Sequence, residues 1–284
     1  MKQMKIKIVL AAMLLYSLTA CRKELLDPVP QTSISVAVAF STPEKALAAV
    51  QGMYAGVKGK LVVGTGITTG YLSGRYQIYQ EVRGENFLNQ TNNGVTNLAT
   101  WNFTVNPGTN EVQNAWYVAY NAINRINIVE KGVQTSPISD ALKMQYMAEG
   151  RFLRALTYFS LVSLYARPYW DGNGDKPGLV IYTEPQTGSG ENQKQRATVA
   201  EVYNLIISDL NFAESNLPLT YTGIQNVLRA HRNAAIALKT RVYLNMRRYA
   251  DVITEANKIV PLAPPFVASS GVPHALQANI TTVL

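Results

Sequence analysis

The residues with the clearest chemical potential lie in the stretch 84–107, where short amides alternate with aromatic rings. Asn89, Asn92 and Asn93 precede Trp101, and no helical or strand period runs through the stretch. Aromatic faces stack on the C–H faces of sugar rings, and amides donate hydrogen bonds to hydroxyls and accept them. We therefore interpret these four residues as candidate ligand-binding residues for a hydroxylated ring. An amide-rich turn without a ligand is the alternative.

A second polar cluster occupies positions 171–175 and reads Asp-Gly-Asn-Gly-Asp, like the opening of an EF-hand calcium loop. Lys176 stands where that loop requires a glycine, and Tyr182 stands where it requires a bidentate glutamate. An acidic turn explains the cluster better than a calcium site does. We therefore expect no cofactor and no metal, with Ca²⁺ kept as the alternative.

Catalytic residue types do not form a recognisable set in the sequence. The chain has two histidines, His231 and His274, and a single cysteine, and no two acids fall in a catalytic motif. The glycine-rich residues 61–70 lack the spacing of a dinucleotide loop and lie between expected helices, so we interpret them as a flexible turn. We predict that the chain is not an enzyme and has no catalytic residues.

The single cysteine, Cys21, follows a segment with the layout of a signal peptide. Three lysines precede a short apolar run, and Leu18-Thr19-Ala20-Cys21 resembles a bacterial lipobox. We predict that residues 1–20 are a lipoprotein signal peptide, that Cys21 is lipidated, and that residues 21–41 form an extended tether. Such a chain is anchored to a membrane through lipid and does not span it.

The formal net charge of +8 raises the question of nucleic-acid binding. Part of this charge comes from the lysines of the expected signal peptide, and the remaining basic residues are scattered along the chain. A solvated helix face explains them, so we expect no nucleic-acid partner.

Helices are the elements that must position these residues. Residues 136–167 carry the widest apolar stripe, in which Phe152, Ala155 and Phe159 recur at steps of three and four, and Pro168 forbids continuation. Further helices are expected at 42–58, 70–83, 110–133, 198–217, 230–247 and 249–260, the 198–217 helix being capped by Thr198. The last two form a pair resembling a degenerate tetratricopeptide repeat. The expected fold is mainly α, an α-α superhelix of tetratricopeptide-like helical pairs with irregular loops.

Several motifs, taken in order, together resemble the SusD/RagB family. They are the segment 21–33 behind the lipobox, the helix ending in Gly52-Met53-Tyr54, the run Trp116-Tyr117 to Asn124-Arg125-Ile126-Asn127, and Ala148-Glu149-Gly150-Arg151-Phe152. The resemblance covers nearly the whole chain and matches the N-terminal portion of a typical member. Gly150 stands where the family usually has alanine.

This resemblance implies a lipid-anchored, surface-exposed lipoprotein of the outer membrane of Bacteroidota. Such a protein captures oligosaccharides and delivers them to a partner TonB-dependent SusC-like transporter. Residues 42–260 would form the SusD-like helical domain, and residues 261–284 would begin an incomplete C-terminal portion. An oligopeptide-binding member of the same family and a purely protein-binding helical scaffold are the alternatives, and the resemblance leaves the ligand and the transporter unidentified.

Overall fold

The computed structural model describes residues 36–58, 60–63, 66–69, 74–84, 98–188 and 193–260. The chain divides into two compact units, Met1–Val38 and Ala39–Leu284. All the elements that bear on the candidate site belong to the second unit.

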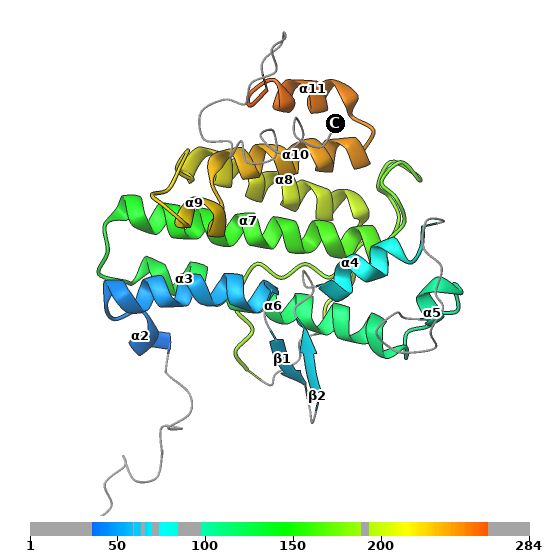
Figure 1. Cartoon of the computed structure of the whole chain (residues 1–284), viewed down its shortest axis with the longest axis horizontal. Coiled ribbons are helices and arrows are strands. Elements are labelled where there is room, and N and C mark those ends of the chain that lie inside the picture. The colour runs from blue at the N-terminus through cyan, green and yellow to red at the C-terminus, as the bar shows by residue number, and fades with distance from the viewer. Residues whose placement is uncertain are drawn as a thin grey trace, which may run out of the picture. The chain divides into compact units, whose positions relative to one another are not determined.

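Helices dominate the second unit, and the mainly α fold expected from the sequence is confirmed (Figure 1). The long helices are α3 (Pro43–Lys58), α6 (Asn110–Gln134), α7 (Asp140–Tyr165), α8 (Val199–Asn216) and α10 (Arg232–Asn245). The shorter ones are α4 (Gly74–Glu81), α5 (Leu98–Trp101), α9 (Gln225–Leu228) and α11 (Tyr249–Ala256), and α2 (Val36–Ala39) lies at the boundary between the two units.

A small β-hairpin corrects one expectation. Strands β1 (Lys60–Val63) and β2 (Gly66–Thr69) pair antiparallel, with Val63 opposite Gly66, in the stretch interpreted from its glycines as a flexible turn. β-Branched residues flank those glycines on both sides, and they favour a paired, extended backbone. The glycines were therefore given too much weight relative to their neighbours.

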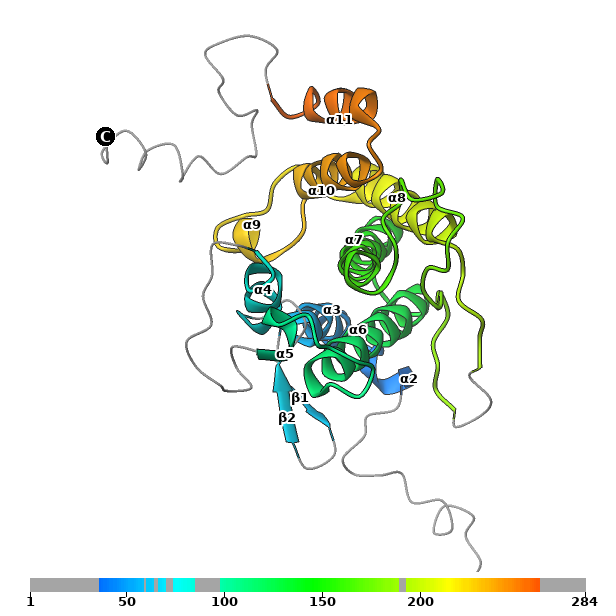
Figure 2. The ribbon, with the colours of Figure 1, turned by 90° about the vertical axis from the view of Figure 1, so that its right-hand side faces the viewer.

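Helix α7 lies at the centre of the unit, with α3 and α6 on one side and α8 and α10 on the other (Figure 2). Its buried apolar side chains include Ala148, Leu153, Tyr158 and Leu161. Each fully buried large side chain of this kind contributes about 1.5–3 kcal/mol. The helix begins at Asp140 because the hydroxyl of Ser139 accepts a hydrogen bond from the amide of Leu142, so it starts four residues later than the expected residue 136.

A local capping box and a buried ion cluster fix the helices α8, α10 and α11. Thr198 and Glu201 form a reciprocal capping box at the start of α8, so the predicted cap is confirmed. Lys239 of α10 is buried and pairs with Glu214 of α8 and with Glu255 of α11. This cation holds the α10–α11 pair against α8.

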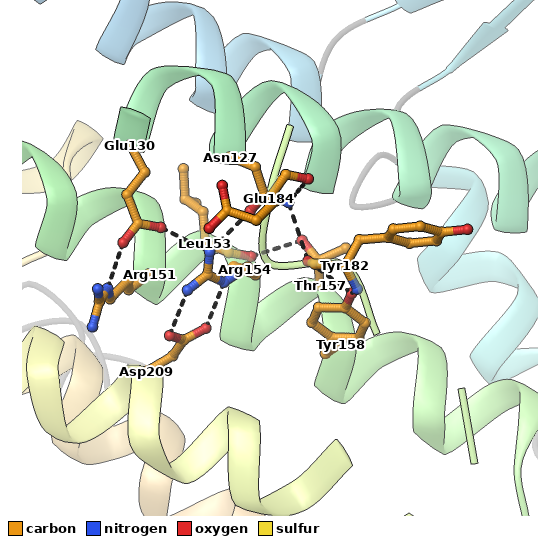
Figure 3. A network of polar contacts seen from close by, with 10 residues as sticks. All are labelled: Asn127, Glu130, Arg151, Leu153, Arg154, Thr157, Tyr158, Tyr182, Glu184 and Asp209. Carbon is orange, nitrogen blue, oxygen red and sulfur yellow. Dashed lines mark hydrogen bonds and ion pairs between the residues drawn. The ribbon is translucent and has the colours of Figure 1, made fainter. Parts of the chain in front are cut away.

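A buried ion cluster joins α6, α7 and α8 (Figure 3). The guanidinium of Arg154 donates to both carboxylate oxygens of Asp209, at 2.7 and 2.8 Å, and to Glu130 at 2.7 Å. The other oxygen of Glu130 accepts from Arg151 at 2.7 Å. Because a buried charge is costly unless it is paired, this cluster fixes which faces of the three helices meet.

Two asparagines of α6 hold the segment that links α7 to α8. Asn124 donates from its amide nitrogen to the carbonyl of Gln186 at 2.9 Å and accepts from the amide of Gln186 at 2.7 Å. Asn127 donates to the carbonyls of Tyr182 and Glu184, at 3.1 and 3.2 Å (Figure 3). The amides thus supply the partners that this irregular backbone needs.

Candidate ligand-binding site

The sequence-predicted site residues are only partly within reach of the structure. Asn89, Asn92, Asn93 and the proposed lipidation residue Cys21 lie outside the described residues. Trp101 is the last residue of α5 and is partly exposed. Its close neighbours in the chain line a hollow, which makes this part of the amide-aromatic stretch the place to examine.

The hollow, of about 200 Å³, lies where α4 and the turn after it, α5 and the segment after it, and the facing ends of α6 and α7 meet. Nine residues from these four places line it: Tyr79, Arg83, Thr100, Phe103, Val105, Val112, Ala115, Leu164 and Tyr165. A second hollow, of about 440 Å³, shares Val105, Val112 and Tyr165 with the first and adds Asn106, Pro107, Gln113 and Trp116. The shared residues make the two hollows adjoin.

Phe103 projects from this site in a backbone conformation that phenylalanine rarely adopts. Its φ is +57°, and its side chain is 71% exposed. The amide of Phe103 donates to the carbonyl of Thr100 and the amide of Thr104 to that of Ala99, at 3.2 and 2.8 Å, which is the Schellman ending of a helix. Glycine is the usual residue at this position, so an exposed aromatic ring held there is a feature that a ligand would explain.

The inner wall of the hollow is a fixed aromatic cluster. The hydroxyl of Tyr165 donates to the carbonyl of Val112 at 2.7 Å, and the Trp116 ring meets Tyr165 edge to face with centroids 5.1 Å apart. Trp116 also lies against Tyr120, with centroids 4.6 Å apart. Burial raises the pKa of Tyr165, so its hydroxyl stays neutral at physiological pH. The wall is therefore rigid and uncharged.

The polar groups of the site lie mainly at its rim. Arg83 and Gln113 are exposed and line the two hollows. The side chain of Asn106 accepts from the amide of Gly108 at 2.9 Å, so this amide is used in a local turn. Ring faces with donors around them suit a partly apolar, hydroxylated ligand such as a sugar.

A larger hollow, of about 930 Å³, lies between α3, α7, α9 and α10, and two of its polar lining residues, Tyr54 and Arg229, belong to a part-buried polar cluster. The Tyr54 hydroxyl donates to Glu149 at 2.7 Å and accepts from the amide of Ala230 at 2.9 Å. Arg229 donates from Nε to Glu149 at 2.9 Å and makes a second contact through Nη2. This cluster anchors the segment around α9 on α3 and α7, so we assign these groups a structural role.

The cluster at 171–175 forms a turn. Gly172, Asn173 and Gly174 have φ of 80°, 54° and 87°, and Asp171 accepts from Arg167 at 2.6 Å. A β-carbon on Gly174 would lie 2.9 Å from Ala200, so the turn packs closely on the start of α8. Among the described residues, no three His, Cys, Asp or Glu side chains gather as a metal site would require.

Comparison with known proteins assigns this chain to a family. The profile of the SusD-like family described as starch-binding and associating with the outer membrane matches residues 56–244. The chain belongs to the SusD-like family. The family as a whole thus combines carbohydrate binding with association with the outer membrane.

Individual relatives agree with this assignment. A SusD-like protein of Formosa agariphila is 25% identical over 99% of this chain and 49% of its own length. A SusD superfamily crystal structure from Bacteroides fragilis is 29% identical, with a TM-score of 0.71 over 80% of this chain and 51% of that one. Another, from Bacteroides thetaiotaomicron, is 25% identical, with a TM-score of 0.64 over 76% and 45%. The chain thus spans about half the length of these SusD-like relatives.

Sequence reasoning missed the buried polar residues whose hydrogen bonds organise the fold. Glu149 was noted only as part of a family motif, yet it has no solvent exposure. Asn124 and Asn127 were noted only as part of a family motif. Their spacing of three places both amides on one face of α6, next to apolar Ile123 and Ile126, and this was the available signal for a buried polar role.

Proposed function

We propose that this SusD-like chain is a non-enzymatic binding protein that captures oligosaccharides at the cell surface and delivers them to a TonB-dependent outer-membrane transporter. The observation that carries the proposal is the exposed ring of Phe103, held in a left-handed backbone at the mouth of an aromatic hollow. Family membership supports the ligand class.

The proposed capture rests on stacking of a sugar ring against Phe103, with hydrogen bonds from the rim. A single aromatic contact contributes about 0.5–1.5 kcal/mol beyond its buried area, so each contact is modest. Weak individual contacts suit a protein that must release its ligand to a transporter. Tethering both proteins to one membrane would offset this weakness by raising the local concentration.

The placement of the buried acids supports binding without turnover. Glu149 and Asp209 are buried and accept hydrogen bonds from the guanidinium groups of Arg229 and Arg154. A carboxylate committed to an arginine does not readily serve as a general acid for glycoside cleavage. Incubation of the pure protein with chromogenic glycosides is expected to release no product, and turnover would overturn this part of the proposal.

Lipidation of Cys21 is the proposed means of surface attachment. In the described residues, no helix combines the length and the apolar character that crossing a bilayer requires. Mass spectrometry of the mature protein is expected to find acyl groups on Cys21, and Cys21→Ser is expected to release the chain from membranes. An unmodified thiol on a protein that remains in the cytosol would refute the proposal.

Isothermal titration tests which class of ligand the chain binds. The full chain is titrated with starch, laminarin, other oligosaccharides and a set of oligopeptides. We expect an oligosaccharide to bind and Phe103→Ala to weaken it about tenfold, which corresponds to about 1.4 kcal/mol. Trp170→Ala is the matched control, because Trp170 is also an exposed ring, 51% accessible, and does not line the hollow. Equal losses in both variants would exclude the hollow as the site.

The same titration distinguishes the alternatives. Binding of peptides alone would favour the oligopeptide-binding function. Failure of every soluble ligand, together with retrieval of a large barrel protein in a pull-down, would favour the protein-binding scaffold.

A further inference from the structure

We propose that the aromatic hollow selects anionic glycans, and that Arg83 is the residue that recognises their carboxylate or sulfate group. The inference rests on the proposed function, since it names the class of oligosaccharide that the same site takes. It starts from the charge of the lining: among the described residues that line the two hollows, Arg83 is the single charged one.

Arg83 has a defined position even though its side chain is exposed. Val82 beside it is buried, and the amide of Val82 donates to the carbonyl of Ile78 at 2.9 Å. On the other side, the amide of Gly84 donates to the carbonyl of Glu81 at 2.9 Å. These contacts continue the turn after α4 and fix the backbone from which Arg83 reaches the hollow.

The guanidinium of Arg83 is left available within the described part of the chain. Arg151, Arg154 and Arg229 each donate to a carboxylate, at 2.7, 2.7 and 2.9 Å. No described carboxylate lies within ion-pair distance of Arg83. Its charge is therefore not offset by a described acid, in contrast with the arginines that build the core.

The surroundings of Arg83 fit an anion attached to a ring. A guanidinium presents a planar fork of donors that matches a carboxylate or a sulfate ester with two parallel hydrogen bonds. Phe103 lines the same hollow and offers the face on which the sugar ring would stack. The neutral hydroxyl of Tyr165 adds no negative charge to oppose the ligand. Stacking would thus supply affinity for any sugar, and Arg83 would supply the preference for an acidic one.

A pair of ligands that differ in charge alone tests the inference. Oligogalacturonate and its methyl ester share the same rings and linkages, and only the first carries carboxylates. Each is titrated into the full chain at 50 mM NaCl, with a sulfated galactan oligosaccharide as a third arm that separates sulfate from carboxylate recognition. The variants are Arg83→Gln and, as a control with the same loss of charge, Arg241→Gln, which lies on an exposed part of α10 away from the hollow.

We expect the wild-type chain to bind an anionic glycan about two- to fivefold more tightly than the neutral ester, since that is the range that one ion pair at an exposed site contributes. Arg83→Gln should abolish the ratio and Arg241→Gln should keep it. Raising NaCl to 500 mM should weaken anion binding in the wild type and leave Arg83→Gln unchanged.

Two results overturn the inference in different ways. Neutral binding that depends on Phe103, with no preference for either anion or with a preference that survives Arg83→Gln, refutes the role of Arg83 and leaves the proposed function standing. No binding of any glycan, neutral or charged, refutes the proposed function and this inference together.

Discussion

Replacement of Phe103 by glycine and by alanine separates backbone strain from ligand binding at one position. Both variants remove a ring that is 71% exposed, so they lose the same small burial. They differ in the cost of a left-handed backbone at φ +57°, which is about 1–2 kcal/mol for a residue with a β-carbon and is absent for glycine. Glycine is more flexible than alanine in the unfolded chain, and this lowers the stability of the glycine variant by about 0.5–1 kcal/mol.

We therefore expect Phe103→Gly to be more stable than Phe103→Ala by about 0.5–1 kcal/mol, the reverse of their order within a helix. For a chain of this size, that difference corresponds to about 1–4 °C in Tm, which thermal unfolding followed by circular dichroism resolves. Both variants should lose glycan affinity about equally, since neither has the ring.

Arg247 provides the matched control. It has φ +58° in a second Schellman ending, where the amide of Arg248 donates to the carbonyl of Tyr243 at 2.9 Å, and it does not line the hollow. Arg247→Gly should exceed Arg247→Ala in stability by a similar amount with unchanged glycan binding. If the two Phe103 variants unfold at the same temperature, the strain reasoning is wrong. If both keep full affinity, Phe103 is not the stacking surface.

Three further predictions concern the frame of the site. Arg154→Leu should lower the free energy of unfolding by about 3–5 kcal/mol, because it leaves buried carboxylates without their cation; chemical denaturation measures this. Gly150→Ala should raise the free energy of unfolding by about 0.5–1 kcal/mol, since the added β-carbon meets nothing closer than 3.4 Å. Gly132→Ala should lower it by about 1–3 kcal/mol, because the added β-carbon would overlap the Phe40 ring. The opposite order of denaturation midpoints would contradict the packing. Burial lowers the pKa of His231, so the unfolded chain binds the proton more readily and stability falls as pH drops below about 6.5. Between pH 7 and pH 5, the Tm of His231→Gln should fall less than the Tm of the wild-type chain. An equal fall would show that His231 is not the source of the pH dependence.

The helical frame was largely predictable because its signals are local. The apolar stripe of α7 and the Thr198 cap of α8 lie within a few residues of the structure they specify. Where two local signals competed, the weaker one was chosen: the glycines of 61–70 were weighed above their β-branched neighbours, which form β1 and β2.

The candidate site was predictable only in part. The amide-aromatic stretch pointed to the correct neighbourhood, since Thr100, Phe103 and Val105 line the hollow. Its other walls come from α4, α6 and α7, and no local pattern brings Tyr79 beside Tyr165. The left-handed conformation of Phe103 was also invisible, because the sequence places a phenylalanine where a Schellman ending usually has glycine.

By itself, the sequence determined the long helices, the Thr198 cap and the family, because periodicity, capping and motif order act over short stretches. The tertiary structure alone decided which charges are buried and which rings share a hollow. The partners Arg154 and Asp209 are 55 residues apart, and Tyr54 and Glu149 are 95 apart. Whether such groups meet depends on how whole helices pack, since the free-energy cost of burying a charge is offset only where an opposite charge lies beside it.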